Sequence, residues 1–164
     1  MTCTVLSVAP SANASTVGYM LDQSNALPDG IEYVMVVLSD DIAGQLDVWV
    51  ETQTSLSGIA GDNYGIQSFG FNLADGSAVL PLSDDFILPD GWNVKTHKNM
   101  SEAGMFDFRL QGTGQSRQDP LHFSVLGLAT EDIANDFASH IAGFAYSNRI
   151  NSAFFYGNGI RSLP

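Results

Sequence analysis

The sequence predicts an all-β protein: a single domain over residues 1–164, folded as an antiparallel β-sandwich of jelly-roll type with one short helix. Three observations predict this fold. Apolar residues make up 45% of the chain and charged residues only 15%. Several segments alternate between apolar and polar residues with period two. Turn signals separate these segments at intervals of roughly 10–20 residues. The 164 residues suffice to bury a sizeable core in one domain.

The strands are predicted from the alternating or strongly apolar runs. In the segment 46–51, Leu46, Val48 and Val50 share one face, and Trp49 lies on the other. The runs that we expect to form strands are 31–38, 46–51, 66–73, 106–110, 121–125 and 139–145. The core is expected to include Val36, Val48, Phe69, Phe71, Phe106, Phe108, Phe123, Val125 and Ile141.

Gly, Pro, Asp and Asn mark the connections between these strands. The predicted turns are 28–30, 39–41, 58–63, 74–76, 89–91, 112–114 and 158–159.

A short helix is predicted near residues 130–137. Thr130 is a good N-cap, and two acidic residues follow it in the first turn, where the helix dipole favours negative charge. Ile133 and Phe137 are four residues apart and would pack on one face.

The three histidines, His97, His122 and His140, are candidates for chemistry. His140 begins the late alternating run 139–145, where alternation groups it with Ala142 and Phe144. The spacings of 25 and 18 residues match no local zinc motif, and no G-x-S-x-G elbow is present. His122 is expected on the outward side of a strand and His97 in an exposed loop. A hydrolase with an unrecognised histidine-based site remains an alternative.

The charge balance limits the partners. The formal net charge is −12, with only six Lys and Arg, so nucleic acid and anionic membrane surfaces are disfavoured. No apolar run reaches the ~20 residues of a membrane span. Cys3 is the single cysteine, which excludes a disulfide framework within the chain.

Calcium is the one cofactor that the sequence suggests. Asp40 and Asp41, Asp84 and Asp85, and Asp62 in a glycine-rich stretch could supply loop oxygen ligands. There is no EF-hand pattern, and the alternative for these residues is a set of solvated turn carboxylates.

Aromatic side chains near turns or on outward strand faces could stack on sugars. Trp49, Trp92 and Tyr64 are the candidates for ligand binding. The alternative for each is packing in a second sheet or under a loop.

The N-terminal residues 1–14 end in Ala12-Asn13-Ala14, which has the small-x-small form of a signal-peptide cleavage site. These residues are interpreted as the remnant of a signal peptide or as a first strand.

Several motifs follow one another in a fixed order: "YGIQSFGFNL", "LPDGWNV", "GMFDFRLQGTGQSRQDPLHFSVLG", "DFASHIAGF" and "SAFFYGNG". Together they resemble the extracellular domain of the PEP-CTERM sorting-domain proteins, which are exported bacterial proteins sorted by an exosortase. The earlier segment "LPDGIEYVMVVLSDDIAGQLDVWVET" resembles the family's first hairpin. The likeness covers residues 27–159. The chain ends at Ser162-Leu163-Pro164 without the family's sorting tail, so we expect a processed domain or a relative that is sorted differently.

The resemblance implies secretion, an extracellular location at the cell surface or in an exopolysaccharide matrix, and no catalytic residues. The leading hypothesis is therefore a non-enzymatic structural or adhesive module. Its expected partners are proteins or polysaccharides of the matrix, or further copies of the chain joined through an exposed edge strand. A carbohydrate-binding β-sandwich module is the first alternative, and the hydrolase is the second.

Overall fold

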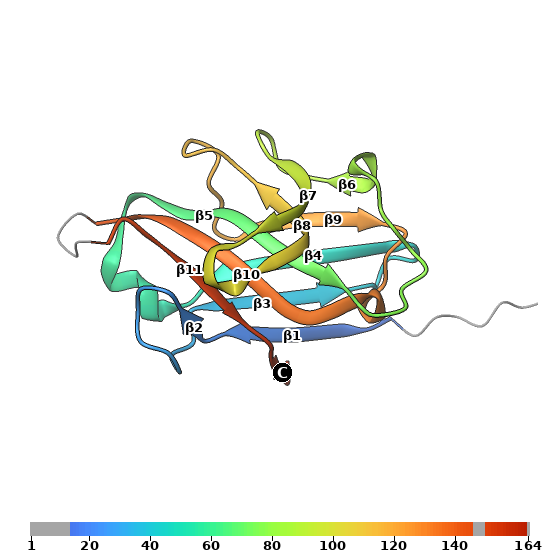
Figure 1. The fold of residues 1–164 in the computed structure, drawn as a ribbon, viewed down its shortest axis with the longest axis horizontal. Helices are drawn as coiled ribbons and strands as arrows, with labels where there is room; N and C mark the ends of the chain where they lie inside the picture. Colours follow the sequence, from blue (N-terminus) through green and yellow to red (C-terminus); the bar gives the residue numbers. More distant parts are fainter. Residues whose placement is uncertain (1–13, 146–149, 164) are drawn as a thin grey trace, which may run out of the picture.

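The computed structural model describes residues 14–145 and 150–163, which form two six-stranded sheets packed face to face (Figure 1). Sheet A has the strand order β12-β1-β3-β4-β9-β6, and sheet B has the order β2-β11-β10-β5-β8-β7. Every strand pair is antiparallel. The predicted all-β sandwich is confirmed. Of residues 1–14, for which a signal remnant or first strand was predicted, only Ala14 is described.

The strands are β1 (Thr16–Leu21), β2 (Gln23–Ser24), β3 (Val34–Ser39), β4 (Gln45–Thr52), β5 (Ala60–Leu73), β6 (Phe86–Ile87), β7 (Asn93–Asn99), β8 (Met105–Gln111), β9 (Leu121–Leu126), β10 (Ile133–Phe144), β11 (Ser152–Gly157) and β12 (Gly159–Arg161). In the part of the chain that the structure describes, four 3₁₀ helices connect some of them: η1 (Thr54–Ile59), η2 (Ser83–Asp85), η3 (Ser101–Ala103) and η4 (Thr130–Asp132).

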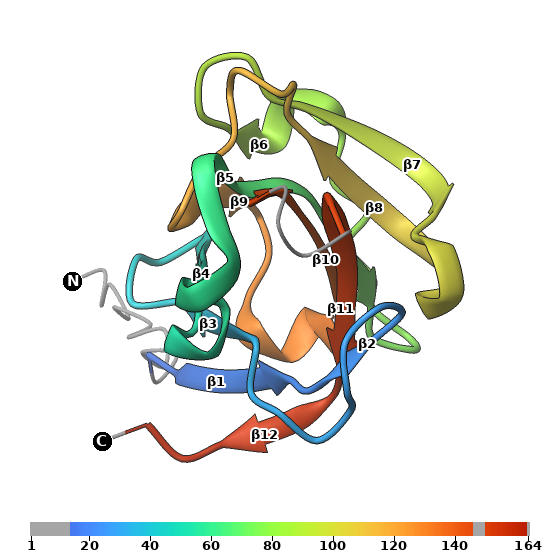
Figure 2. The ribbon, with the colours of Figure 1, turned by 90° about the vertical axis from the view of Figure 1, so that its left-hand side faces the viewer.

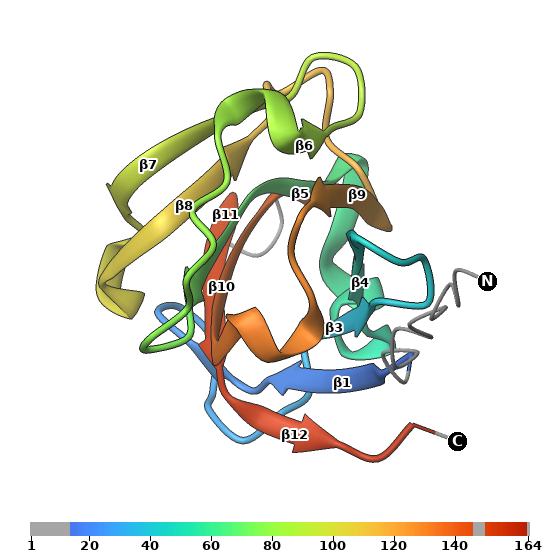
Figure 3. The ribbon, with the colours of Figure 1, turned by 90° about the vertical axis from the view of Figure 1, so that its right-hand side faces the viewer.

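The chain crosses repeatedly between the sheets. It passes from sheet A to sheet B between β4 and β5, and it visits sheet A again for β6 before it returns to sheet B for β7 and β8. It then crosses to sheet A for β9 and back to sheet B for β10. Such crossings are the connectivity expected of a jelly-roll sandwich. The β7–β8 hairpin extends to one side, away from β1 and β12 (Figures 2 and 3).

The space between the sheets is filled largely by aromatic rings. Phe69 of β5 lies 5.9 Å from Phe123 of sheet A and 6.0 Å from Phe137 of β10, measured between ring centroids. Rings at these separations add specific contacts to the burial of apolar area. All nine residues predicted for the core are buried.

One of these nine lies in a different place from the rest. Phe106 packs with Met100 and Ala138 in a second, smaller cluster. A β-carbon on Gly70 would lie 3.0 Å from the Phe106 ring, so the glycine leaves room for it. Because Ala138 and Gly70 are paired across β10 and β5, this cluster lies on the outer face of sheet B, away from the main core.

The helix predicted near residues 130–137 is present only at its start, and its extension to residue 137 is wrong. Only Thr130–Asp132 form a single 3₁₀ turn, and β10 begins at Ile133. The Thr130 hydroxyl donates to Asp40 instead of capping a helix. Pairing of β10 with both β5 and β11 outweighs the local helical preference.

The predicted face of Phe144 and the predicted turn at 58–63 also need correction. Register shifts interrupt the β10–β5 ladder, one of them between Ala142 and Phe144, and Phe144 packs in the main core. Because β10 begins at Ile133, His140 lies within a long strand and not at its start. The segment 58–63 forms the end of η1 and the start of β5.

The glycines of these segments allow the two backbones to approach closely. Gly143 has a φ of +84°, and a β-carbon there would lie 2.0 Å from the carbonyl oxygen of Asn63. A β-carbon on Gly61 would lie 2.7 Å from the carbonyl oxygen of Gly143. Both positions therefore require glycine.

Replacement of Gly143 by alanine is expected to lower the free energy of unfolding by at least about 2 kcal/mol, because the methyl group meets backbone atoms and the backbone angle is strained. Gly58→Ala is the matched control, since nothing lies within 4 Å of its β-carbon position. Urea denaturation of both variants tests this. Equal stabilities of the two variants would contradict the close approach of Gly143 to the Asn63 backbone.

Candidate functional site

The outer face of sheet A carries an exposed aromatic pair. Trp49 of β4 and His122 of β9 are direct cross-strand partners. Their rings are stacked, with centroids 4.5 Å apart and planes 6° from parallel. Trp49 is 36% exposed, so the outward positions predicted from alternation are confirmed for both residues. Because His122 covers one face of the indole, a ligand can reach only the ring edge and the opposite face.

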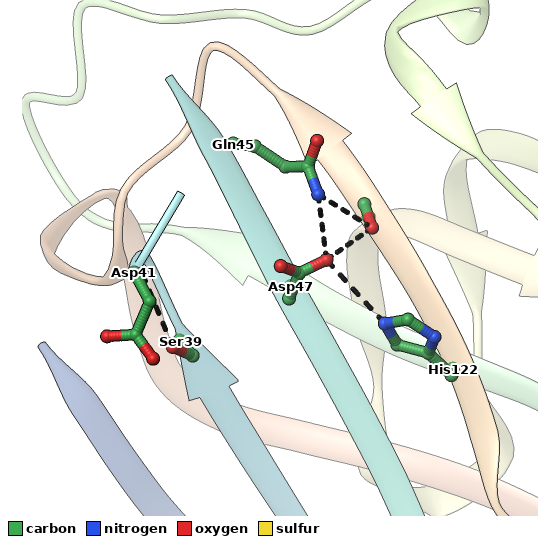
Figure 4. Close-up of polar contacts among 6 residues, drawn as sticks. Ser39, Asp41, Gln45, Asp47 and His122 are labelled. Atoms are coloured by element: carbon green, nitrogen blue, oxygen red, sulfur yellow. Dashed lines mark hydrogen bonds and ion pairs between the residues drawn. The ribbon is translucent and has the colours of Figure 1, made fainter. Parts of the chain in front are cut away.

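A polar network lies beside this pair, one step along the strands (Figure 4). The Asp47 carboxylate accepts hydrogen bonds from Gln45 Nε2 at 3.0 Å and from Ser124 Oγ at 2.5 Å. His122 Nε2 lies 3.6 Å from the same oxygen, Oδ1, within ion-pair range. Asp47 is 7% exposed and Ser124 5%, whereas the His122 ring stands at the surface.

The order of these groups differs from that of a hydrolytic triad. In a triad the serine hydroxyl is hydrogen-bonded to the imidazole that takes its proton. Here Ser124 donates to the Asp47 carboxylate, which lies between the serine and His122. The arrangement orients an imidazole at the surface, above a buried serine and carboxylate, and it suits hydrogen bonding and stacking of His122 with a ligand.

The other aromatic candidates lie elsewhere. Trp92, in the loop before β7, is buried, and its Nε1 donates to the carbonyl oxygen of Ser116 at 2.6 Å. Its ring packs over Gly112, where a β-carbon would lie 2.7 Å from Cε2. Trp92 is thus a packing residue, and the expectation that it is open to a ligand is wrong.

Tyr64 of β5 is half-buried, and its ring centroid lies 5.9 Å from that of Phe144. Burial raises the pKa of Tyr64 to about 12, with Asp119 adding to the rise and Thr52 opposing it. The three candidates come from β4, β5 and the loop before β7, and do not form one platform.

The carboxylates suggested for calcium serve different purposes. Asp40 accepts bonds from the backbone N–H of Ser15 and from both the N–H and hydroxyl of Thr130. Burial acts to raise the pKa of Asp40, but these hydrogen bonds outweigh it and hold the pKa below its usual value. In residues 14–145 and 150–163, no three His, Cys, Asp or Glu side chains come together as a metal site.

The remaining calcium candidates do not join Asp40 in a metal site within the described residues. Asp85 accepts from the backbone N–H of Leu82 at 2.7 Å and closes the η2 turn. Asp41, Asp62 and Asp84 are exposed.

Asp40→Ala is expected to lower the free energy of unfolding by about 1–2 kcal/mol, because three donors lose their acceptor. Asp41→Ala, at the exposed neighbouring position, should stay within about 0.5 kcal/mol of the parent chain. Urea denaturation at neutral pH measures both. A melting temperature that rises on addition of calcium, and only when Asp40 is present, would instead identify a calcium site.

His140 lies on the outer face of sheet B, within a polar and aromatic surface that sequence patterns did not reveal. Its ring stacks on Phe154 of β11, with centroids 4.4 Å apart and planes 17° from parallel. Burial, together with the positive charges of Arg109 and Arg117, lowers the pKa of His140 to about 4. Alternation placed His140 on a strand face, but only the register identifies Phe154 as its partner.

His140 should destabilise the fold at acidic pH. Its folded-state pKa of about 4 lies below the ordinary value of 6.5, so the unfolded chain takes up the proton first as pH falls. Above pH 6.5, His140 therefore does not reduce the free energy of unfolding. As pH falls from 6.5 to about 4, it lowers the free energy of unfolding progressively. Ring-proton shifts followed by NMR should give the low pKa directly. His140→Gln should lose less stability than the parent across this pH range, and equal losses would contradict the assignment.

No protein-family model, curated protein or solved structure matches this chain. Among the described residues, no helix has the length and apolar character needed to cross a membrane.

Proposed function

We propose that the chain is a non-enzymatic extracellular module with a structural or adhesive role, which binds polysaccharide or protein of a surface matrix. The observation that carries this proposal is the Asp47 network, in which the Ser124 hydroxyl donates to a carboxylate and not to an imidazole. The side chains that could meet a partner stand on the outer faces of both sheets. The likeness to the PEP-CTERM extracellular domains supports the secreted location.

The edges of the sheets bear on how such a module would meet its partner. Three of the four edge strands, β2, β6 and β12, have only two or three residues. The fourth, β7, has seven residues and carries Lys95 and Lys98. Lysines on an edge strand discourage pairing with the same strand of another copy. We therefore favour contact with a different molecule over self-association through β7.

A carbohydrate-binding module is the second candidate, because Trp49 stands exposed beside Gln45, Asp47 and His122. An exposed indole edge beside the surface imidazole of His122 suits a sugar, which presents both C–H groups and hydroxyls. Trp92, being buried, takes no part in this candidate site.

Binding without turnover is the test of the proposed function. The purified chain is incubated with a panel of neutral and acidic polysaccharides, and both complex formation and chain length of the polymers are measured. We expect binding to at least one polymer with no shortening of any. Cleavage of a polymer, abolished by His122→Gln or Ser124→Ala, would establish a hydrolase instead.

The tryptophans separate the two candidates. Trp92→Phe leaves Trp49 as the single indole, whose fluorescence reports contact at the outer face of sheet A. A bound sugar at this face should shift the Trp49 emission, and Trp49→Ala should weaken binding about tenfold or more. An unchanged emission on binding would remove this face as the carbohydrate site.

A further inference from the structure

Positive charge is scarce in this chain and gathers at one place. The sequence has six Lys and Arg against eighteen Asp and Glu. Four of the six, Lys95, Lys98, Arg109 and Arg117, lie on β7, β8 and the loop that follows β8. Within the described residues, no carboxylate oxygen lies within 4.0 Å of their charged nitrogens, whereas Arg161 of sheet A pairs with Glu32. In a chain with three acidic residues for every basic one, unpaired cations on neighbouring elements require an explanation.

Arg109 is central to this group. It pairs with Lys95 across β8 and β7, and with Gly70 across β8 and β5. Its Nη1 donates to the carbonyl oxygen of Asn99 at 3.3 Å, while its buried Nε has no hydrogen-bond partner. Burial lowers the pKa of Arg109. A half-buried guanidinium without a counter-ion has capacity left for an anion.

A row of neutral polar groups crosses the sheet beside Arg109. In register order it runs Asn93, Gln111, Ser68 and His140, and the ring of Phe154 follows. Ser68 is buried and its hydroxyl donates to Met100 Sδ, so a ligand would meet Asn93, Gln111 and His140. Amide groups and a neutral imidazole each combine donors with acceptors. They match the hydroxyl groups of a sugar, and the aromatic ring offers an apolar surface at the end of the row.

Arg117 approaches this row from the loop after β8. Its Nε donates to Gln67 Oε1 at 3.0 Å, and its Nη1 donates to the carbonyl oxygen of Asn63 at 2.6 Å. Both partners are neutral. Its charge acts on His140 together with that of Arg109, so the imidazole lies in a positive field that arises from both residues.

We propose that the outer face of sheet B binds an acidic polysaccharide, with sugar carboxylates at Lys95, Lys98 and Arg109 and sugar hydroxyls along the neutral row. This inference rests on the proposed function and names the class of partner. The β7–β8 hairpin carries this face to one side of the sandwich, where a long polymer can pass over it (Figures 2 and 3).

Around Tyr156 of β11 and the η3 turn that joins β7 to β8, the same sheet face is unsuited to an anion. Burial raises the pKa of Tyr156, and the charges of Glu102 and Asp29 add to the rise. A polymer with carboxylates would thus lie over β5, β8 and β7, and its course would avoid Tyr156.

An acidic polysaccharide fits this face better than two other anionic partners. Duplex DNA carries one charge per ~1.7 Å, and a chain with a net charge of −12 would repel it strongly. A second copy of the chain would bring the same net charge and the same edge lysines. A polysaccharide with at most one carboxylate per sugar meets the cations at lower charge density.

The test uses polygalacturonate as the acidic polymer and dextran as the neutral one, with EDTA present to exclude bridging by calcium. Binding is measured by titration calorimetry with the parent chain, Lys95→Gln/Lys98→Gln, and Arg161→Gln as the control cation on sheet A. Both lysines are exposed, so the double variant should keep its fold, which circular dichroism checks.

We expect the parent and Arg161→Gln to bind polygalacturonate and not dextran. The double variant should bind about tenfold more weakly, and affinity should fall as salt is raised. Equal binding of dextran, unaffected by the lysine changes, would overturn this inference while leaving the proposed function in place. A second outcome is that the parent binds no polymer and forms a salt-sensitive dimer, which only the double variant abolishes. The face would then bind a second copy of the chain, and the inference would also be overturned. If the folded parent binds neither polymer, the inference is likewise overturned.

Discussion

The pairing of β10 with β5 in the middle of sheet B is the contact on which the rest of the structure depends. These are the two longest strands, and β10 is hydrogen-bonded to β11 on its other side. Because side chains alternate along a strand, β10 sends Phe137 and Ile141 into the core and presents Ala138 and His140 on the outer face. One strand therefore fixes both the packing against sheet A and the surface at which a partner can bind.

Alternation within the sequence predicted the architecture because most strands have one buried face. It placed Trp49 and His122 outward correctly, and every predicted core residue is buried. It failed where tertiary contacts decide the outcome. The helix predicted from Thr130 onward ends after one 3₁₀ turn, because from Ile133 the chain forms β10 and pairs with β5 and β11. The register shifts next to Gly143 return Phe144 to the core, and such a bulge has no period to detect.

The candidate binding surfaces were only partly open to prediction. The count of residues showed that cations are few. It did not show that the β7–β8 pairing and the bridge between Ile66 and Gln118 bring four of them to neighbouring elements. The burial of Trp92 likewise depends on Gly112 and Ser116, which lie some twenty residues later in the chain. Residue type could be read from the sequence, whereas the neighbours that give each residue its role come from the register.

Hydrogen exchange tests most directly whether the β5–β10 pair is the foundation of the fold. Amides in the middle of β5 and β10 should exchange most slowly, at a rate set by global unfolding, and those of the edge strand β7 much faster through local opening. Exchange in β5 and β10 as fast as in β7 would contradict the account, because the core and the outer face of sheet B would then lack a common support.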